Sequence, residues 1–271
     1  MLRKIYYLLS PNLRLFARKL VYFPIDFIRT KTDSLEPPKG LIYTGRGEFI
    51  KQGEEWMGFF KSNTNLNEHS NVLDIGSGIG RIAVPMTKFL KGNYCGFEPV
   101  KQGVDWCKKN ISSKFSNFDF LYVDLFNDLY RSKGINAANY IFPYQTNYFD
   151  FACSISVFTH MVPEEVENYL KETIKVLKKG GFLVATFFIL DSESKSLMQN
   201  NKDFNFKFDF GHYALMDSVV KSANVGYDKN FLFKQFENTG FKIEKYIKGY
   251  WCGRKKEFNY ALQDIVVLKK L

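Results

Sequence analysis

Acidic residues and closely spaced glycines mark the part of this sequence best suited to binding a ligand. Asp74 follows the branched apolar residues Val72 and Leu73 and precedes glycines at alternate positions, in the stretch NVLDIGSGIG over residues 71–80. This pattern predicts a buried parallel strand, a glycine loop and then a helix over residues 81–90. Glycines permit a tight turn and let a ligand lie against bare backbone, and the following helix start offers N–H groups to an anion. The stretch therefore predicts a ligand site at the carboxyl end of a strand.

Two more acids follow the next predicted strands. Glu98 ends the apolar run 94–97, 24 residues after Asp74, and precedes a predicted helix over residues 101–110. A carboxylate at this place can accept hydrogen bonds from both hydroxyls of a ribose. The alternative role is that of an acid at a helix N-terminus. Asp124 ends a third predicted strand over residues 118–123.

The D-x-G-x-G-x-G pattern resembles motif I of the class I S-adenosylmethionine-dependent methyltransferases. A dinucleotide fingerprint would have a glycine where Arg81 stands, which disfavours an NAD dehydrogenase. The resemblance extends from about residue 45 to the C-terminus. It implies an α/β fold with a Rossmann-like open seven-stranded sheet, mostly parallel with an antiparallel last strand, and helices on both faces. The N-terminal helical extension lies outside the resemblance.

The resemblance also implies S-adenosylmethionine as the cofactor and gives roles to individual residues. The loop glycines leave room for its methionine part, Asp74 orients its amino group, and Glu98 holds the ribose. Asp124 is expected to bind the adenine, with Leu125 or Phe126 against the ring. The complete set of expected cofactor-binding residues is Asp74, Gly76, Ser77, Gly78, Gly80, Glu98, Asp124, Leu125 and Ser156.

A fourth strand is predicted over residues 148–157, and it leads into the sequence SVFTH. Methyltransferases of this class place the residues nearest the methyl group here. The sequence lacks the Asn/Asp-Pro-Pro-Tyr motif of nucleic-acid amino-methyltransferases, which weighs against that chemistry. His160 is the candidate general base for a hydroxyl acceptor, because an imidazole with a pKa near ~6.5 can take a proton at neutral pH. The alternative is that this histidine is structural, with His212 and Arg254 as the other candidates.

The later part of the sequence predicts a helix over residues 163–178 and a strand over 182–190, separated by Lys-Gly-Gly. A polar and aromatic insertion follows over 191–227. The last two strands, 241–250 and 264–268, are predicted to form an antiparallel hairpin. In the family, the insertion and the segment before motif I contact substrate or cover the cofactor. The substrate-side candidates are Tyr43, Arg46, His212, Tyr213 and Arg254, with packing and turn roles as the alternative.

The first 31 residues carry seven basic residues and one acid, interleaved with bulky apolar side chains, in a chain with a net charge of +10. Pro11 and Pro24 are expected to cut this segment into short helical pieces. Such a segment suits a helix lying in an anionic membrane interface, at the inner membrane surface, and the alternative is a helical cap on the domain's own core. The sequence shows no 18-residue apolar run that could span a membrane and no signal peptide.

The four cysteines are scattered and lack neighbouring histidines, which predicts a reduced, cytoplasmic protein without a metal site. The expected organisation is an extension and linker over residues 1–40 and a methyltransferase domain over 41–271. The expected activity is O-methylation of a small molecule, sugar or lipid-linked glycan. The alternatives are a nucleic-acid methyltransferase, with charge in its favour, and a non-catalytic cofactor-binding scaffold at a membrane. The pattern does not distinguish a sugar hydroxyl from a lipid or an amine.

Overall fold

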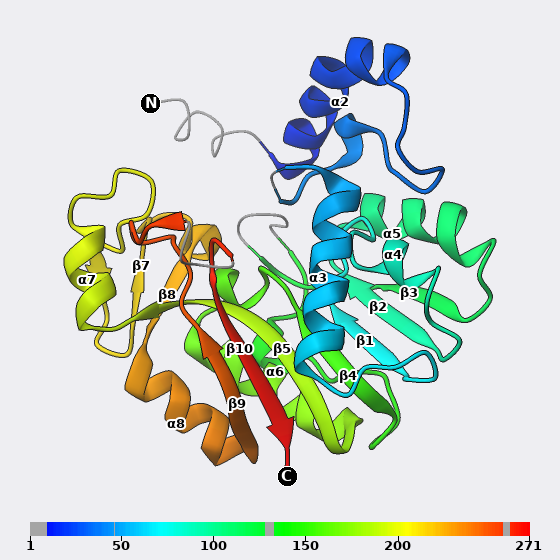
Figure 1. Cartoon of the computed structure of the whole chain (residues 1–271). Helices are drawn as coiled ribbons and strands as arrows, with labels where there is room; N and C mark the ends of the chain where they lie inside the picture. Colours follow the sequence, from blue (N-terminus) through cyan, green and yellow to red (C-terminus); the bar gives the residue numbers. More distant parts are fainter. Residues whose placement is uncertain (1–9, 46, 128–132, 257–260) are drawn as a thin grey trace. The chain divides into compact units, whose positions relative to one another are not determined.

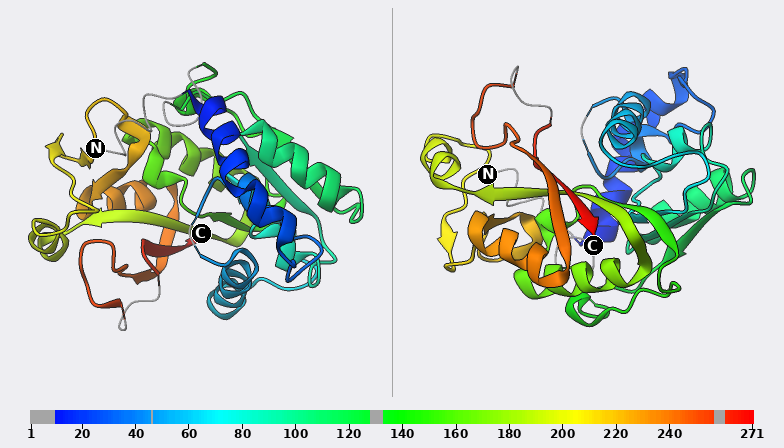
Figure 2. Two further views of the ribbon diagram at one scale, coloured as in Figure 1. Left: turned by 90° about the horizontal axis from the view of Figure 1, so that it is seen from above. Right: turned by 60° about the horizontal axis from the view of Figure 1, so that its bottom comes forward.

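The computed structural model describes residues 10–45, 47–127, 133–256 and 261–271, which belong to two compact units, Met1–Asp124 and Leu125–Leu271 (Figures 1 and 2). The helices are α2 (Pro11–Ile28), η1 (Lys39–Leu41), α3 (Phe49–Asn63), α4 (Ala83–Met86), α5 (Lys101–Cys107), η2 (Lys108–Ser112), η3 (Ala137–Asn139), η4 (Phe158–His160), α6 (Pro163–Val176), α7 (Ser192–Met198), η5 (Lys221–Ala223) and α8 (Lys229–Thr239). The strands are β1 (Val72–Ile75), β2 (Tyr94–Glu98), β3 (Phe118–Tyr122), β4 (Phe149–Ser154), β5 (Leu177–Leu190), β6 (Phe208–Asp209), β7 (Tyr213–Leu215), β8 (Val225–Asp228), β9 (Phe241–Ile247) and β10 (Asp264–Lys270).

The first unit contains a parallel three-stranded arrangement in the order β3-β2-β1. Every residue of β1 is buried, as its branched apolar sequence predicts for a central parallel strand. Parallel pairing brings the carboxyl ends of the three strands to one edge. This edge carries the glycine loop after Ile75, the carboxylate of Glu98 and the backbone of Asp124. The predicted strands of this unit are confirmed.

The second unit is built around β5, a 14-residue strand. Residues 151–154 of β4 pair with it in parallel, and β10 pairs with its residues 182–187 in antiparallel fashion. β10 in turn pairs with β9, which confirms the antiparallel hairpin predicted for the end of the chain. The last residues of β5, 188–190, pair with β8, and β7 and β6 continue outward from β8. The predicted insertion thus adds strands to the end of β5.

Several predicted helices have different bounds, and the one expected over residues 101–110 is α-helical only to Cys107 and continues as a π-helix to Ser112. The helix expected over residues 81–90 is only four residues long; Pro85 has no N–H with which to bond the carbonyl of Arg81, so the helix does not begin there, and turns follow Met86. The helix expected to run to Lys178 ends at Val176, and β5 begins directly at Leu177. α2 continues through Pro24 instead of breaking there. Pro24 has no N–H, so the carbonyl four residues earlier in the helix lacks its usual donor. Because Pro24 is exposed, water can donate to that carbonyl instead.

The core of the second unit continues from the main strands into the inserted segment. Phe187 on β5 stacks on Phe158, with 5.1 Å between ring centroids. Phe188, the next residue, points into a different cluster with Phe206 and Trp251, each at 5.4 Å from it. Because successive side chains of a strand point to opposite faces, β5 is covered on both. The insertion is therefore packed on β5 through an aromatic cluster of its own.

Candidate cofactor and active site

The loop after β1 has a backbone that only glycine adopts readily. Gly76, Gly78 and Gly80 have φ angles of 75°, 57° and 81°, in the left-handed region. The N–H groups of Gly76 and Ser77 both donate to the carbonyl of Phe97 on β2, at 3.0 and 3.1 Å. The alternation of glycines in the sequence is thus a conformational requirement, and β2 holds the loop in place.

Glu98 is buried at the end of β2 and is hydrogen-bonded to this loop. Its carboxylate accepts from the N–H of Gly78 and from the N–H of Val100, both at 3.0 Å. Burial raises the pKa of Glu98 to about 7, although those N–H groups and the Tyr43 hydroxyl favour the ionised form. The two N–H donors fix the orientation of a carboxylate that can exchange a proton near neutral pH.

Two other polar side chains lie beneath the loop. Asp74 is buried, and its carboxylate accepts a hydrogen bond from the hydroxyl of Tyr94 on β2. Ser77 is buried as well, and its hydroxyl has no hydrogen-bond partner within the described residues. A Cβ added to Gly78 would lie 3.3 Å from the hydroxyl oxygen of Thr44, so the bare backbone of Gly78 faces Thr44. An orphaned buried hydroxyl and a bare stretch of backbone fit the polar methionine end of S-adenosylmethionine.

Tyr43 lies on the cofactor side of the first unit. A Cβ on Gly103 of α5 would lie 2.3 Å from its hydroxyl oxygen, so the ring reaches the start of α5 next to Glu98. The sequence predicted a substrate contact for Tyr43, and the structure places its hydroxyl against the cofactor loop. Arg46, another predicted substrate contact, lies outside the described residues.

The predicted adenine-binding residues stand at the boundary in sequence between the two units. Asp124 is exposed and ends the first unit, while Leu125 is buried and begins the second. Leu125 makes a parallel β-bridge with Ile135. Their contact with adenine stays a prediction.

In the second unit, Ser156 and His160 follow β4. Ser156 has a φ of 60°, which is unusual for a residue other than glycine and is found often at functional sites. Its N–H donates to the Thr186 hydroxyl at 2.7 Å, and its own hydroxyl donates to Gln263 at 2.9 Å. His160 is half-buried in η4, and its Nδ1 lies 2.7 Å from the carbonyl oxygen of Ser222. Both side chains are therefore held by specific partners.

His212 and Tyr213 belong to the inserted segment. His212 is exposed and stacks on Phe231, at 4.6 Å between ring centroids. Tyr213 is half-buried on β7 and stacks on Phe210 at 5.0 Å, and burial raises the pKa of its hydroxyl. Their contact with substrate stays a prediction.

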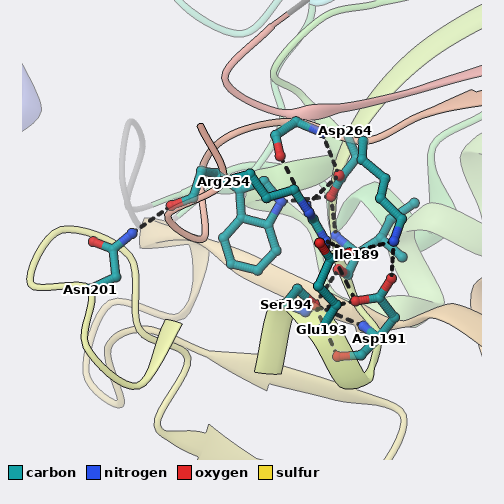
Figure 3. Close-up of polar contacts among 10 residues, drawn as sticks. Ile189, Asp191, Glu193, Ser194, Asn201, Arg254 and Asp264 are labelled. Atoms are coloured by element: carbon teal, nitrogen blue, oxygen red, sulfur yellow. Dashed lines mark hydrogen bonds and ion pairs between the residues drawn. The ribbon is translucent and has the colours of Figure 1, made fainter. Parts of the chain in front are cut away.

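Arg254 belongs to a charged network at the end of β5 (Figure 3). Its side chain is only 6% exposed, and its guanidinium lies 3.3 Å from Glu193, 3.5 Å from Asp191 and 3.6 Å from Asp264. It also donates to the carbonyl of Gly249 at 2.9 Å. Protein groups thus surround the guanidinium, and this arrangement holds residues 249–254, which follow β9. The predicted contact of Arg254 with substrate stays a prediction.

The centre of that network is Asp264, which is fully buried. Its carboxylate accepts from the N–H of Ile189 and the indole N–H of Trp251, both at 2.7 Å, and from the N–H of Gly249 at 2.8 Å (Figure 3). Burial raises its pKa to about 6, against the opposing effect of these donors and of Arg254. One carboxylate thereby joins β5, β10 and the loop that carries Trp251.

Replacing Asp264 by alanine is expected to lower the free energy of unfolding by about 3–5 kcal/mol, because buried donors lose their acceptor and Arg254 loses a carboxylate. Thermal and urea unfolding measure this change. Asp203→Ala, at an exposed acid of the same unit, serves as the control and should leave stability within experimental error. An Asp264→Ala variant as stable as the wild type would contradict the role given to this network.

The sequence interpretation missed two residues that matter here. Arg81 stood out only because it replaces a glycine of the dinucleotide fingerprint, yet its guanidinium donates to Thr44 and Gln52. Asp264 was taken only as the first residue of a strand. A signal was present in each case: a charged residue directly after a glycine loop, and an acid opening an otherwise apolar strand.

Comparison with known proteins supports the assignment of this fold. Residues 73–185 match the family described as methyltransferase domain. A methyltransferase from Methanosarcina mazei has a TM-score of 0.52 at 17% identity, over 79% of this chain and 97% of that one. A methyltransferase from Aquifex aeolicus has a TM-score of 0.51 at 14% identity, over 82% and 92%.

A third similar structure is the 1,6-didemethyltoxoflavin N1-methyltransferase of Burkholderia thailandensis, with bound 1,6-didemethyltoxoflavin and S-adenosylhomocysteine. Its TM-score is 0.51 at 12% identity, over 82% of this chain and 78% of that one. At these identities the solved structures establish the fold, and the match of residues 73–185 establishes the domain. The glycine loop, the buried Glu98 and the mixed sheet agree with both. The chain therefore has the class I S-adenosylmethionine-dependent methyltransferase fold and contains, over residues 73–185, a methyltransferase domain.

Proposed function

We propose that this methyltransferase methylates a hydroxyl group of a small molecule, a sugar or a lipid-linked glycan, with His160 as the general base. The observation that carries this proposal is the contact of His160 Nδ1 with the Ser222 carbonyl. A carbonyl only accepts, so the neutral imidazole carries its proton on Nδ1 and has its lone pair on Nε2. Nε2 is then the atom able to take a proton from a hydroxyl.

The cofactor supplies an electrophilic methyl group, and the residues of the first unit are proposed to hold it. Glu98 would accept from the ribose hydroxyls, Asp74 would orient the amino group, and Asp124 would accept from the adenine. In the second unit we give Ser156 a cofactor contact, and His212 and Tyr213 contacts with the acceptor. Alignment of reactants accounts for much of the rate in such a displacement, since well-oriented groups recover ~7–11 kcal/mol. His160 adds removal of the hydroxyl proton.

Transfer of a labelled methyl group from S-adenosylmethionine into extracts tests this function. We expect label in the small-molecule or lipid fraction, in a bond stable to the mild alkali that cleaves methyl esters, as an ether is. Label in the nucleic-acid fraction would support the nucleic-acid alternative instead. Binding of the cofactor without transfer to soluble or membrane extracts would support a non-catalytic scaffold.

We further propose that α2 places the protein on an anionic membrane surface. The polar residues Arg14, Arg18, Tyr22 and Asp26 recur every fourth position and are buried or half-buried. The Asp26 carboxylate accepts from the N–H groups of residues 39 and 40, at 2.6 and 2.8 Å. This helix therefore turns its polar face toward its own unit, the reverse of a helix that caps a core.

The opposite face of α2 is apolar and exposed. Phe16, Leu20, Phe23 and Phe27 recur at intervals of three or four residues, and between 57% and 82% of each is exposed. Lys19 beside them is exposed as well and would favour anionic lipid. No helix within the described ranges is long and apolar enough to cross a membrane. An interfacial position is the arrangement that would bury this face.

Sedimentation with vesicles tests the membrane proposal. We expect binding to vesicles of phosphatidylcholine with phosphatidylglycerol, weakened by salt, and at least a tenfold loss of partitioning in the double variant Leu20→Ser, Phe27→Ser (roughly 1.4 kcal/mol per tenfold). Val219→Ser, at an exposed valine of the other unit, is the control. The proposal is wrong if the wild type does not bind the vesicles or if the control variant loses as much binding as the double variant. It is also wrong if the wild type forms a dimer that the double variant abolishes.

A further inference from the structure

Arg81 is the first residue after the glycine loop, and its guanidinium is held by neutral groups. Nη2 donates to the carbonyl of Thr44 at 2.8 Å, and Nη1 donates to the side-chain oxygen of Gln52 at 2.5 Å. The guanidinium carbon also lies 4.8 Å from the centre of the Phe49 ring. The guanidinium also approaches the backbone of Gly45 so closely that this position needs a glycine, since a Cβ there would lie 2.8 Å from Nη2. The side chain is thus fixed in place by three contacts.

No carboxylate within the described residues lies at ion-pair distance from this guanidinium. Burial lowers the pKa of Arg81 to about 10, as expected for a cation removed from water without a counter-charge. Two other arginines with little exposure have acidic partners: Arg29 pairs with Glu36, and Arg254 with acids of the network at the end of β5. Arg81 is half-buried, and a cation partly removed from water without a counter-charge is unfavourable unless an anion joins it. Arg81 therefore has the properties of an anion-binding residue.

The position of Arg81 indicates which anion. Thr44, whose carbonyl accepts from Arg81, places its hydroxyl next to Gly78 of the glycine loop. Glu98 bonds the N–H of that same glycine and stands at the proposed ribose end of the cofactor. The amino-acid end of S-adenosylmethionine carries a carboxylate, which matches the planar donors of a guanidinium.

We propose that Arg81 binds the methionine carboxylate of the cofactor, with Gln52 and Thr44 holding its guanidinium in position. The proposal rests on the assignment of the glycine loop as the cofactor site. Two of the five N–H donors are used by Thr44 and Gln52, so others remain to meet a carboxylate. Neutral partners suit this task, because they orient the cation without neutralising it.

Two ligands that differ at the amino-acid end test the proposal by calorimetric titration. S-adenosylhomocysteine has the carboxylate, whereas 5′-methylthioadenosine keeps the adenosine and the thioether sulfur but lacks the amino acid. We expect Arg81→Gln to weaken binding of S-adenosylhomocysteine about 10- to 100-fold and to leave binding of 5′-methylthioadenosine within a factor of about two. Arg81→Lys should lose less than Arg81→Gln. Lys88→Gln, at an exposed lysine of the same unit, is the control.

Gln52→Glu gives a second test that does not remove the arginine. A carboxylate at this position would pair with Arg81 and compete with the ligand, so the same selective loss is expected together with a higher melting temperature. If Arg81→Gln weakens both ligands equally, or Gln52→Glu weakens neither, Arg81 only supports the loop and the proposal is wrong. If the wild type binds neither ligand, the assignment of the cofactor site is wrong instead.

Discussion

Replacing His160 by alanine is expected to lower the rate of methyl transfer about 10²- to 10⁴-fold while leaving the affinity for S-adenosylhomocysteine unchanged. The reason is that the only role proposed for His160 is to remove the proton from the acceptor hydroxyl. The Ser222 carbonyl fixes the tautomer and orientation of the ring, and no contact of His160 is assigned to the cofactor. The measurement is the initial rate of label transfer, next to a titration with S-adenosylhomocysteine.

A structural role for His160 would give a different set of results. If His160 is the base, the wild-type rate at saturating S-adenosylmethionine should rise with pH as the imidazole loses its proton, and this dependence should vanish in His160→Ala. His69→Ala, at an exposed histidine of the first unit, should keep the wild-type rate and the wild-type pH profile. An unchanged rate in His160→Ala would contradict the assignment, as would a loss of rate explained fully by a lower melting temperature.

The second large effect is expected at Glu98. Replacing it by glutamine should weaken S-adenosylhomocysteine binding about 100-fold at pH 8, because hydrogen bonds from the ribose to a charged acceptor are lost. The amide also fits the site poorly, since its NH₂ group faces one of the two backbone N–H donors, of Gly78 or of Val100. Glu54→Gln, at an exposed acid of the same unit, should bind as the wild type does.

Glu98 should also give opposite pH trends for stability and for cofactor binding. Its pKa is raised from 4.5 to about 7 in the folded protein, so the folded state binds the proton more tightly than the unfolded state. The resulting stabilisation is complete below pH 4.5 and is lost as the pH rises through about 7, with Asp264 acting in the same direction near 6. Affinity for the cofactor should instead rise between pH 6 and 8, as the carboxylate ionises. Melting temperatures and titrations over this range measure both trends, and parallel trends would contradict the assignment.

Local sequence pattern was sufficient to predict the cofactor loop. The alternating glycines, the branched residues of β1 and the acid at the end of β2 each act through neighbours in sequence or through one parallel pairing. The hairpin at the end of the chain was predicted for the same reason, since β10 has an apolar run and β9 alternates apolar with charged residues. Short-range periodicity determines such elements almost completely.

Contacts between distant residues were beyond prediction from a single sequence. Nothing local to Tyr43 or Arg81 indicates that both lie against the glycine loop, because the approach depends on how the segment before α3 folds back. The carboxylate of Asp264 joins backbone groups that are 75 and 15 residues away in sequence. The length of α2 depended on the exposure of Pro24, which is likewise a property of the folded chain.

The most direct test of the account is a calorimetric titration of S-adenosylhomocysteine into the wild-type protein at pH 8. We predict saturable binding of one ligand per chain at micromolar concentrations, with a higher melting temperature in its presence. The glycine loop and Glu98 would then be confirmed as a working cofactor site. The Glu98→Gln and Arg81→Gln variants would test its ribose end and its methionine end separately. Absence of both heat and thermal shift at millimolar ligand would contradict the central claim that residues 74–98 bind the methyl donor.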